Sequence, residues 1–141
     1  MRRLRAEEGY SLVELMVVVL IVGVLAAVAV PTLLGQRAKA QDTGAKAATV
    51  TAAKAAIAFG TDRGGFEDAT PEDLARVEKS LADARGLRVE GASRTFTVSV
   101  DSASGTTFSI ARAEGGEITR DCTPAGSGGC RETADARGNR W

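Results

Sequence analysis

The first sixty residues change from a continuous apolar pattern to a pattern with helical period. From Leu15 to Leu34 the only polar side chain is that of Thr32. A helix over this stretch spans roughly 30 Å, the thickness of the hydrocarbon core of a bilayer. Residues 35–60 are rich in alanine, and their apolar positions recur at helical spacing. We therefore expect one long helix with a membrane-spanning first half, whose second half packs through Leu34, Ala38, Ala45, Ala48, Ala52, Ala55, Ala56 and Phe59.

A second, short helix is predicted after a glycine-rich break at residues 60–65. Thr70 is a suitable N-cap, Pro71 fits the first helical position, and two acidic residues follow in the first turn. Gly86 is a natural stop. We expect the buried stripe of this helix to consist of Leu74, Val77 and Leu81.

The following residues change to a period of two, which is typical of half-buried strands. Apolar and hydroxyl side chains alternate over 95–100 and again over 106–111, and a third strand is expected at 117–120, with 87–89 as a possible fourth. Residues 101–105 join the first two strands. As a metal loop they would offer one carboxylate and two hydroxyls, too few for a hard cation, so a hairpin turn is favoured. The expected buried face comprises Phe96, Val98, Val100, Phe108, Ile110 and Ile118, which gives an α+β fold.

The apolar segment also carries signals for membrane insertion. Arg2, Arg3 and Arg5 precede it, which places its N-terminal side in the cytoplasm. A secretory signal peptide cut after Ala29 and a permanent signal anchor both fit these features. Neither explains Glu14, a carboxylate at the edge of the apolar run, because such a group needs a cationic partner.

A cut after Gly9 would create that partner. The new α-amine of Tyr10 would lie one helical turn from Glu14, and the amine of a neighbouring copy could serve equally well. The sequence Gly9-Tyr10-Ser11-Leu12-Val13-Glu14, followed by an apolar helix with Pro31 at its far end, resembles the type IV prepilins and pseudopilins. The chain departs from the usual pattern in having Tyr10 where Phe is common and Glu7-Glu8 ahead of the glycine.

This resemblance implies a leader at 1–9, a membrane and filament-core helix at 10–34, and a soluble head at 35–141. It implies that a dedicated membrane peptidase cuts between Gly9 and Tyr10 and methylates Tyr10. It also implies that the helix can loosen near Gly23 and Pro31 when subunits enter a filament. The expected partners are further copies of the chain, the prepilin peptidase, the assembly machinery and, before assembly, membrane lipid. The expected location is the cell membrane and then the extracellular filament, and the expected fold is a helical spine with an antiparallel sheet across it.

Cys122 and Cys130 are the only cysteines, and the chain contains no histidine, so they cannot complete a tetrahedral zinc site. In an exported chain they are expected to form a disulfide around a short loop, and many pilins resemble this arrangement. Residues 131–141 are polar until Trp141, and we expect a mobile tail whose tryptophan docks on the head or on a neighbour.

Composition excludes several other functions. The chain has 18 basic and 18 acidic residues, and removal of residues 1–9 would leave 15 and 16. This balance gives no signal for nucleic acid. With no histidine, no nucleophile elbow and no phosphate loop, we expect no enzyme and no cofactor. The alternatives to a pilus subunit are a pseudopilin of a secretion or DNA-uptake machine and an exported binding module. A mature chain that begins at Tyr10 indicates a pilin, one that begins at Val30 a signal peptide, and one that begins at Met1 an anchor.

Overall fold

The computed structural model describes residues 10–141, so the predicted leader and Gly9 lie outside the described residues. The chain divides into two compact units, Met1–Gly35 and Gln36–Trp141. Helix α1 (Leu12–Arg63) contributes residues to both units, and its first half and second half are described separately below.

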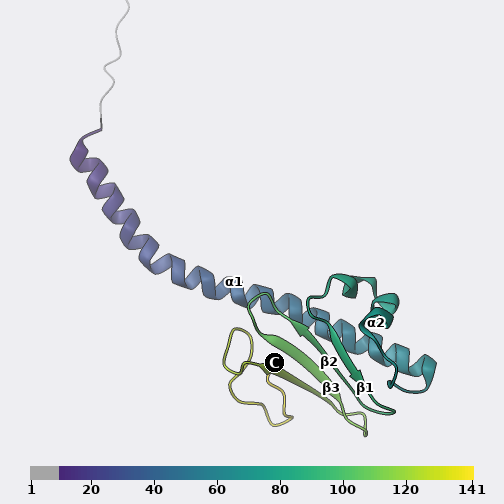
Figure 1. Cartoon of the computed structure of the whole chain (residues 1–141). Coiled ribbons are helices and arrows are strands. Elements are labelled where there is room, and N and C mark those ends of the chain that lie inside the picture. The colour runs from purple at the N-terminus through teal and green to yellow at the C-terminus, as the bar shows by residue number, and fades with distance from the viewer. Residues whose placement is uncertain (1–9) are drawn as a thin grey trace, which may run out of the picture. The chain divides into compact units, whose positions relative to one another are not determined.

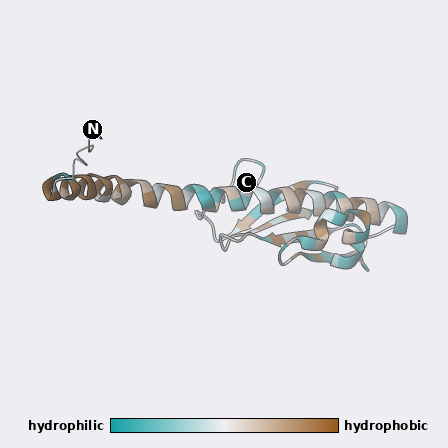
Figure 2. Cartoon of the chain, turned by 90° about the horizontal axis from the view of Figure 1, so that it is seen from above, coloured by the Kyte–Doolittle hydropathy of each residue, from teal (hydrophilic) through white to brown (hydrophobic). Residues whose placement is uncertain are grey.

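In the first unit, α1 is the one element that the described residues form. Leucine, alanine and methionine favour a helix, and the valines are tolerated because tertiary or lipid contacts outweigh their small propensity cost. The helix continues through Pro31, and the hydroxyl of Thr32 donates back to the carbonyl of Ala29 at 2.8 Å. Figure 2 shows this segment as almost uniformly hydrophobic. By length and composition, α1 is able to cross a membrane.

The second unit combines the rest of α1 with an antiparallel sheet in the order β1-β2-β3-β4 (Figure 1). The strands are β1 (Arg88–Gly91), β2 (Phe96–Asp101), β3 (Thr107–Arg112) and β4 (Ile118–Thr123). Val98 lies opposite Ile110, and Val100 lies opposite Phe108, so the apolar side chains of β2 and β3 share one face. The predicted α+β architecture, including the fourth strand, is confirmed.

The core of this unit lies between the sheet and the alanine-rich face of α1. Small side chains on the helix let the larger residues of the sheet approach closely. The rings of Phe66 and Phe96 meet edge to face with centroids 5.0 Å apart. The predicted face of α1 is correct for the buried residues Ala45, Ala52, Ala55, Ala56 and Phe59. Ala38 and Ala48 are only half-buried, and Leu34 is exposed within the first unit.

The predicted second helix is shorter than expected. Helix α2 (Pro71–Val77) begins with a capping box in which Thr70 and Asp73 satisfy each other's backbone N–H groups. It ends at Glu78, whose backbone is extended, and a 3-10 turn η1 (Lys79–Asp83) follows. This break directs Leu81 into the core from η1 and leaves Val77 49% exposed, so the prediction that Val77 is buried was wrong.

On the sheet, five of the six residues predicted to be buried are buried, and Ile118 is not. It stands at the start of the edge strand β4 and is 40% exposed, whereas Cys122 is the buried residue of that strand. Asp101 ends β2, and its carboxylate is engaged by both guanidinium nitrogens of Arg88 and by the hydroxyl of Thr107. These hydrogen bonds, chiefly those from Arg88, hold the pKa of Asp101 below its usual value against the opposing effect of burial.

Candidate functional site

The first candidate site is the exposed apolar surface of α1. Every valine, leucine, isoleucine and methionine between Leu12 and Leu34 is 47–73% exposed. A continuous apolar surface of this length is far larger than soluble monomers expose, so it requires lipid or protein around it.

A single carboxylate interrupts this surface. Glu14 lies in the first turn of α1, and the side chains of Glu14 and Tyr10 are both exposed. No ion pair among residues 10–141 includes Glu14. The N-terminus of a helix carries a partial positive charge, which favours an acidic side chain in the first turn. The predicted pairing with a Tyr10 amine depends on cleavage at Gly9, outside the described residues, and stays a prediction.

The predicted hinge positions are both helical. A Cβ added at Gly23 would meet nothing within 4 Å, so packing in the described structure does not demand glycine there. Pro31 lies inside the helix. Proline removes a backbone hydrogen bond and disturbs the preceding turn, so a hinge at these residues stays a prediction.

The second candidate region surrounds the disulfide. Cys122, at the end of β4, and Cys130 form the predicted bond, and both are buried. The loop that they close is fixed to α1 by two contacts at Gly129. Its N–H donates to the carboxylate of Asp42 at 2.6 Å, and its carbonyl accepts from Lys46 Nζ at 2.7 Å. The loop is therefore held against the helix by polar contacts as well as by the covalent bond.

Asp42 is completely buried, although nothing in the sequence reading singled it out. Its carboxylate also accepts from the hydroxyl of Ser104, whose oxygen lies 3.0 Å from the hydroxyl oxygen of Ser102. Burial by itself raises the pKa of Asp42, but the hydrogen bonds from Ser104, Ser102 and the Gly129 N–H, with the charge of Lys46, outweigh it and lower the pKa. Asp42 therefore stays ionised inside the unit. The spacing of Asp42 along α1 could have predicted its burial, because Asp42 lies at helical spacing from Ala45 and Thr49 on the buried face of the helix.

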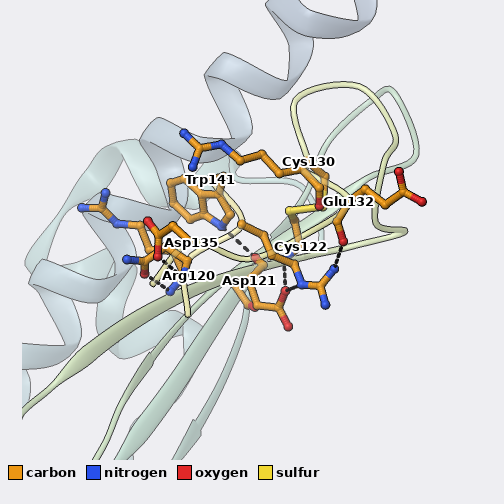
Figure 3. Close-up of polar contacts among 11 residues, drawn as sticks. Arg120, Asp121, Cys122, Cys130, Glu132, Asp135 and Trp141 are labelled. Atoms are coloured by element: carbon orange, nitrogen blue, oxygen red, sulfur yellow. Dashed lines mark hydrogen bonds and ion pairs between the residues drawn. A yellow bond between two sulfur atoms is a disulfide. The ribbon is translucent and has the colours of Figure 1, made fainter. Parts of the chain in front are cut away.

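The predicted tail is held in place by specific contacts. Arg140 N–H donates to the carbonyl of Arg120 at 2.9 Å, and Arg131 N–H donates to the carbonyl of Arg140 at 3.0 Å. The indole N–H of Trp141 donates to the carbonyl of Asp121 at 2.7 Å (Figure 3). The indole ring also meets the ring of Phe108 edge to face. The expectation of a mobile tail was wrong, and docking of Trp141 on the head is confirmed.

Comparison with known proteins gives matches to both units. The family model "Prokaryotic N-terminal methylation motif" matches residues 4–30. A "Fimbrial protein" of Pseudomonas aeruginosa is 38% identical over 90 residues, which cover 59% of this chain and 57% of the relative. "Fimbrial protein Q" of Moraxella bovis is 35% identical over 91 residues, covering 62% and 52%. "Type II secretion system core protein G" of Vibrio cholerae is 50% identical over 40 residues, covering 28% and 27%. The chain thus spans little more than half the length of the two fimbrial relatives.

Proposed function

We propose that this chain, which belongs to the type IV pilin and pseudopilin family, is a structural subunit of a type IV pilus-like filament. The observation that carries the proposal is the first half of α1. It is a helix whose large apolar side chains are all exposed and whose first turn contains one carboxylate. The methylation motif covers this same helix.

Processing would precede assembly. A prepilin peptidase would cut between Gly9 and Tyr10 and methylate the new amine, while the apolar helix holds the chain in the membrane with its N-terminus in the cytoplasm. The assembly machinery would then transfer the subunit from lipid to the extracellular filament. This exchange replaces lipid contacts with contacts between helices, so the apolar surface stays out of water throughout.

In the filament core, Glu14 would neutralise the amine of Tyr10, either in the same chain or in a neighbouring copy. An unpaired charge in an apolar bundle is strongly disfavoured, so each group makes the presence of the other tolerable. Pairing through a neighbouring copy would also fix the position of one helix along the next. Gly23 and Pro31 would allow the helix to adjust as it enters the core.

The test compares Glu14→Ala with the control Glu67→Ala in the native host. Glu67 is exposed in the second unit and has no partner among the ion pairs of residues 10–141. We expect Glu14→Ala subunits to be cleaved and folded but to remain in the membrane, with filament yield reduced at least tenfold. Glu67→Ala should assemble normally. Yield is measured as sheared filaments counted by electron microscopy, beside immunoblots of the membrane fraction. A normal yield from Glu14→Ala would contradict the charge-neutralisation mechanism.

The second candidate function is that of a pseudopilin, which is built alike but forms a short fibre. It is favoured by the similarity of 40 residues to the core protein of a type II secretion system. The longer matches to fimbrial proteins favour the pilus. Labelling of the subunit on whole cells distinguishes the two functions. Long labelled filaments outside the cell indicate a pilus. No such filaments, together with blocked secretion in a strain that lacks the gene, indicate a pseudopilus.

A further inference from the structure

The docked tail lines an open hollow of about 490 Å³ on the surface of the second unit. Its lining includes three arginines from two segments of the chain, Arg120 on β4 and Arg131 and Arg137 in the tail. The other polar or aromatic residues that line the hollow are Asp135, Asn139 and Trp141. The labelled residues Arg120, Asp135 and Trp141 gather on one side of the disulfide in Figure 3.

None of these three arginines forms an ion pair or a side-chain hydrogen bond with another residue of the described range, 10–141. Arg140, by contrast, does not line the hollow and is paired with Asp121 at 3.0 Å. Three unpaired guanidinium groups around one hollow repel one another. A counter-charge placed between them would relieve that repulsion.

The side-chain carboxylate in the lining, that of Asp135, offsets only one of these three positive charges. Asp135 accepts hydrogen bonds from the backbone N–H groups of Arg137 and Asn139, each at 2.9 Å. These bonds, with that of Asn139 first, and the nearby charge of Arg131 hold the pKa of Asp135 below its usual value against the opposing effect of desolvation. The carboxylate closes the turn between Asp135 and Asn139 and stays negative, so the three guanidinium groups leave the side chains of the hollow with an excess of positive charge.

The arrangement is also preorganised. The turn is closed by Asp135 N–H donating to the carbonyl of Asn139 at 2.8 Å, and the amide oxygen of Asn139 accepts from the Arg120 N–H at 2.9 Å. The guanidinium of Arg120 lies 5.4 Å from the centroid of the Trp141 ring, a distance that fits a cation–π contact. A fixed backbone and a guanidinium supported by an aromatic ring reduce the entropy lost on binding a ligand.

We propose that this hollow binds a tetrahedral oxyanion, either a phosphate or a sulfate ester. Each guanidinium presents a planar fork of N–H donors that matches two oxygens of such an anion, and a tetrahedral group offers enough oxygens for several forks at once. The doubly negative charge of a phosphate monoester matches the excess positive charge of the hollow. A hollow of this volume also has room for atoms of the molecule that carries the ester group. This inference does not depend on filament assembly.

The single tryptophan of the chain reports on the site directly, because Trp141 lines the hollow. The full chain, labelled with ¹⁵N and held in nonionic detergent micelles, gives one indole N–H signal. Sodium phosphate and sodium sulfate are titrated against sodium chloride at matched ionic strength. We expect the indole signal to shift saturably at millimolar phosphate or sulfate and to show no saturable shift with chloride.

The variants Arg131→Gln and Arg137→Gln should each weaken the affinity for phosphate about tenfold, since each removes a charge-assisted contact. Arg76→Gln is the matched control, because Arg76 lies on α2 and is paired with Asp73 outside the hollow, and it should leave the affinity unchanged. The backbone spectrum verifies that each variant remains folded. An equal shift with chloride, or equal affinity for phosphate in the Arg131→Gln, Arg137→Gln double variant, would overturn the proposal. Tighter binding of glucose 6-phosphate than of glucose 6-sulfate would identify a phosphate ester as the ligand, and the reverse order would identify a sulfate ester.

Discussion

Truncation of Asp42 to alanine removes the polar group that ties the disulfide loop to α1. The substitution leaves the N–H of Gly129 and the hydroxyl of Ser104 without their acceptor; Asp42 itself is fully buried, whereas these two partners are partly buried. Hydrogen bonds to a charged group contribute about 1.5–3 kcal/mol each. Lys46 keeps its bond to the carbonyl of Gly129 and is only half-buried, so its charge stays partly solvated. Because two hydrogen bonds to the carboxylate are lost and both donors are only partly buried, we expect Asp42→Ala to lower the free energy of unfolding of the second unit by about 3 kcal/mol, the lower end for two bonds.

The assay is urea unfolding of the full chain in nonionic detergent, followed by far-ultraviolet circular dichroism. The matched control is Asp62→Ala on the same helix, because Asp62 is exposed and belongs to no ion pair of the described residues. Asp62→Ala should change the free energy of unfolding by less than about 0.5 kcal/mol. A change of that small size for Asp42→Ala would refute the reasoning that this carboxylate anchors the loop.

The pH dependence gives a second test of the same site. Because the pKa of Asp42 in the folded unit is lower than in the unfolded chain, its stabilising effect is complete above the ordinary carboxyl pKa of about 4 and is lost as the pH falls through the folded value. The lowered pKa values of Asp101 and Asp135 act in the same direction. The difference in stability between the native chain and Asp42→Ala should therefore be constant above about pH 5 and shrink below about pH 4.

Two further substitutions test the packing of the second unit. Cys122→Ser should lower the free energy of unfolding by about 2.5 kcal/mol, because the disulfide closes a loop with a sequence separation of 8. Reduction of the native chain with dithiothreitol should shift the urea midpoint by the same amount. An unchanged midpoint would contradict a stabilising role of the disulfide. Gly91→Ala should destabilise by more than about 1 kcal/mol, because the added Cβ would collide with the backbone carbonyl of Phe66. Gly44→Ala is its control and should be neutral or stabilising in the same urea titration, since Gly44 is helical and its added Cβ would meet nothing within 4 Å.

The parts of the fold that periodicity determines could be predicted from the sequence. The period of two over β2 and β3 correctly predicted the buried residues of these strands, from Phe96 to Ile110. Alternation places all apolar side chains of a strand on one face, and that face is the one that is buried. The helical period correctly predicted the burial of Ala45, Ala52, Ala55, Ala56 and Phe59. The predictions for Val77 and Ile118 were wrong because both stand at the end of an element, where the next turn of the chain decides burial.

The polar contacts between distant segments could not be predicted from the sequence. Asp42 and Gly129 are 87 residues apart and meet only because the disulfide loop lies against α1. The polar sequence of the tail predicts mobility, whereas its backbone N–H and carbonyl groups form hydrogen bonds with β4 and within the turn that Asp135 closes. The methylation motif of the first unit could be recognised from the sequence because it is local and lies within one continuous segment, residues 4–30.

Mass spectrometry of filaments sheared from cells tests the central claim most directly. The proposed function predicts that the assembled chain begins at Tyr10, carries one methyl group on its α-amine and contains the Cys122–Cys130 disulfide. The change Gly9→Leu should remove the chain from the filament fraction and leave it unprocessed in the membrane. A filament fraction that lacks this chain, or an assembled chain that begins at Met1 or Val30, would contradict the account.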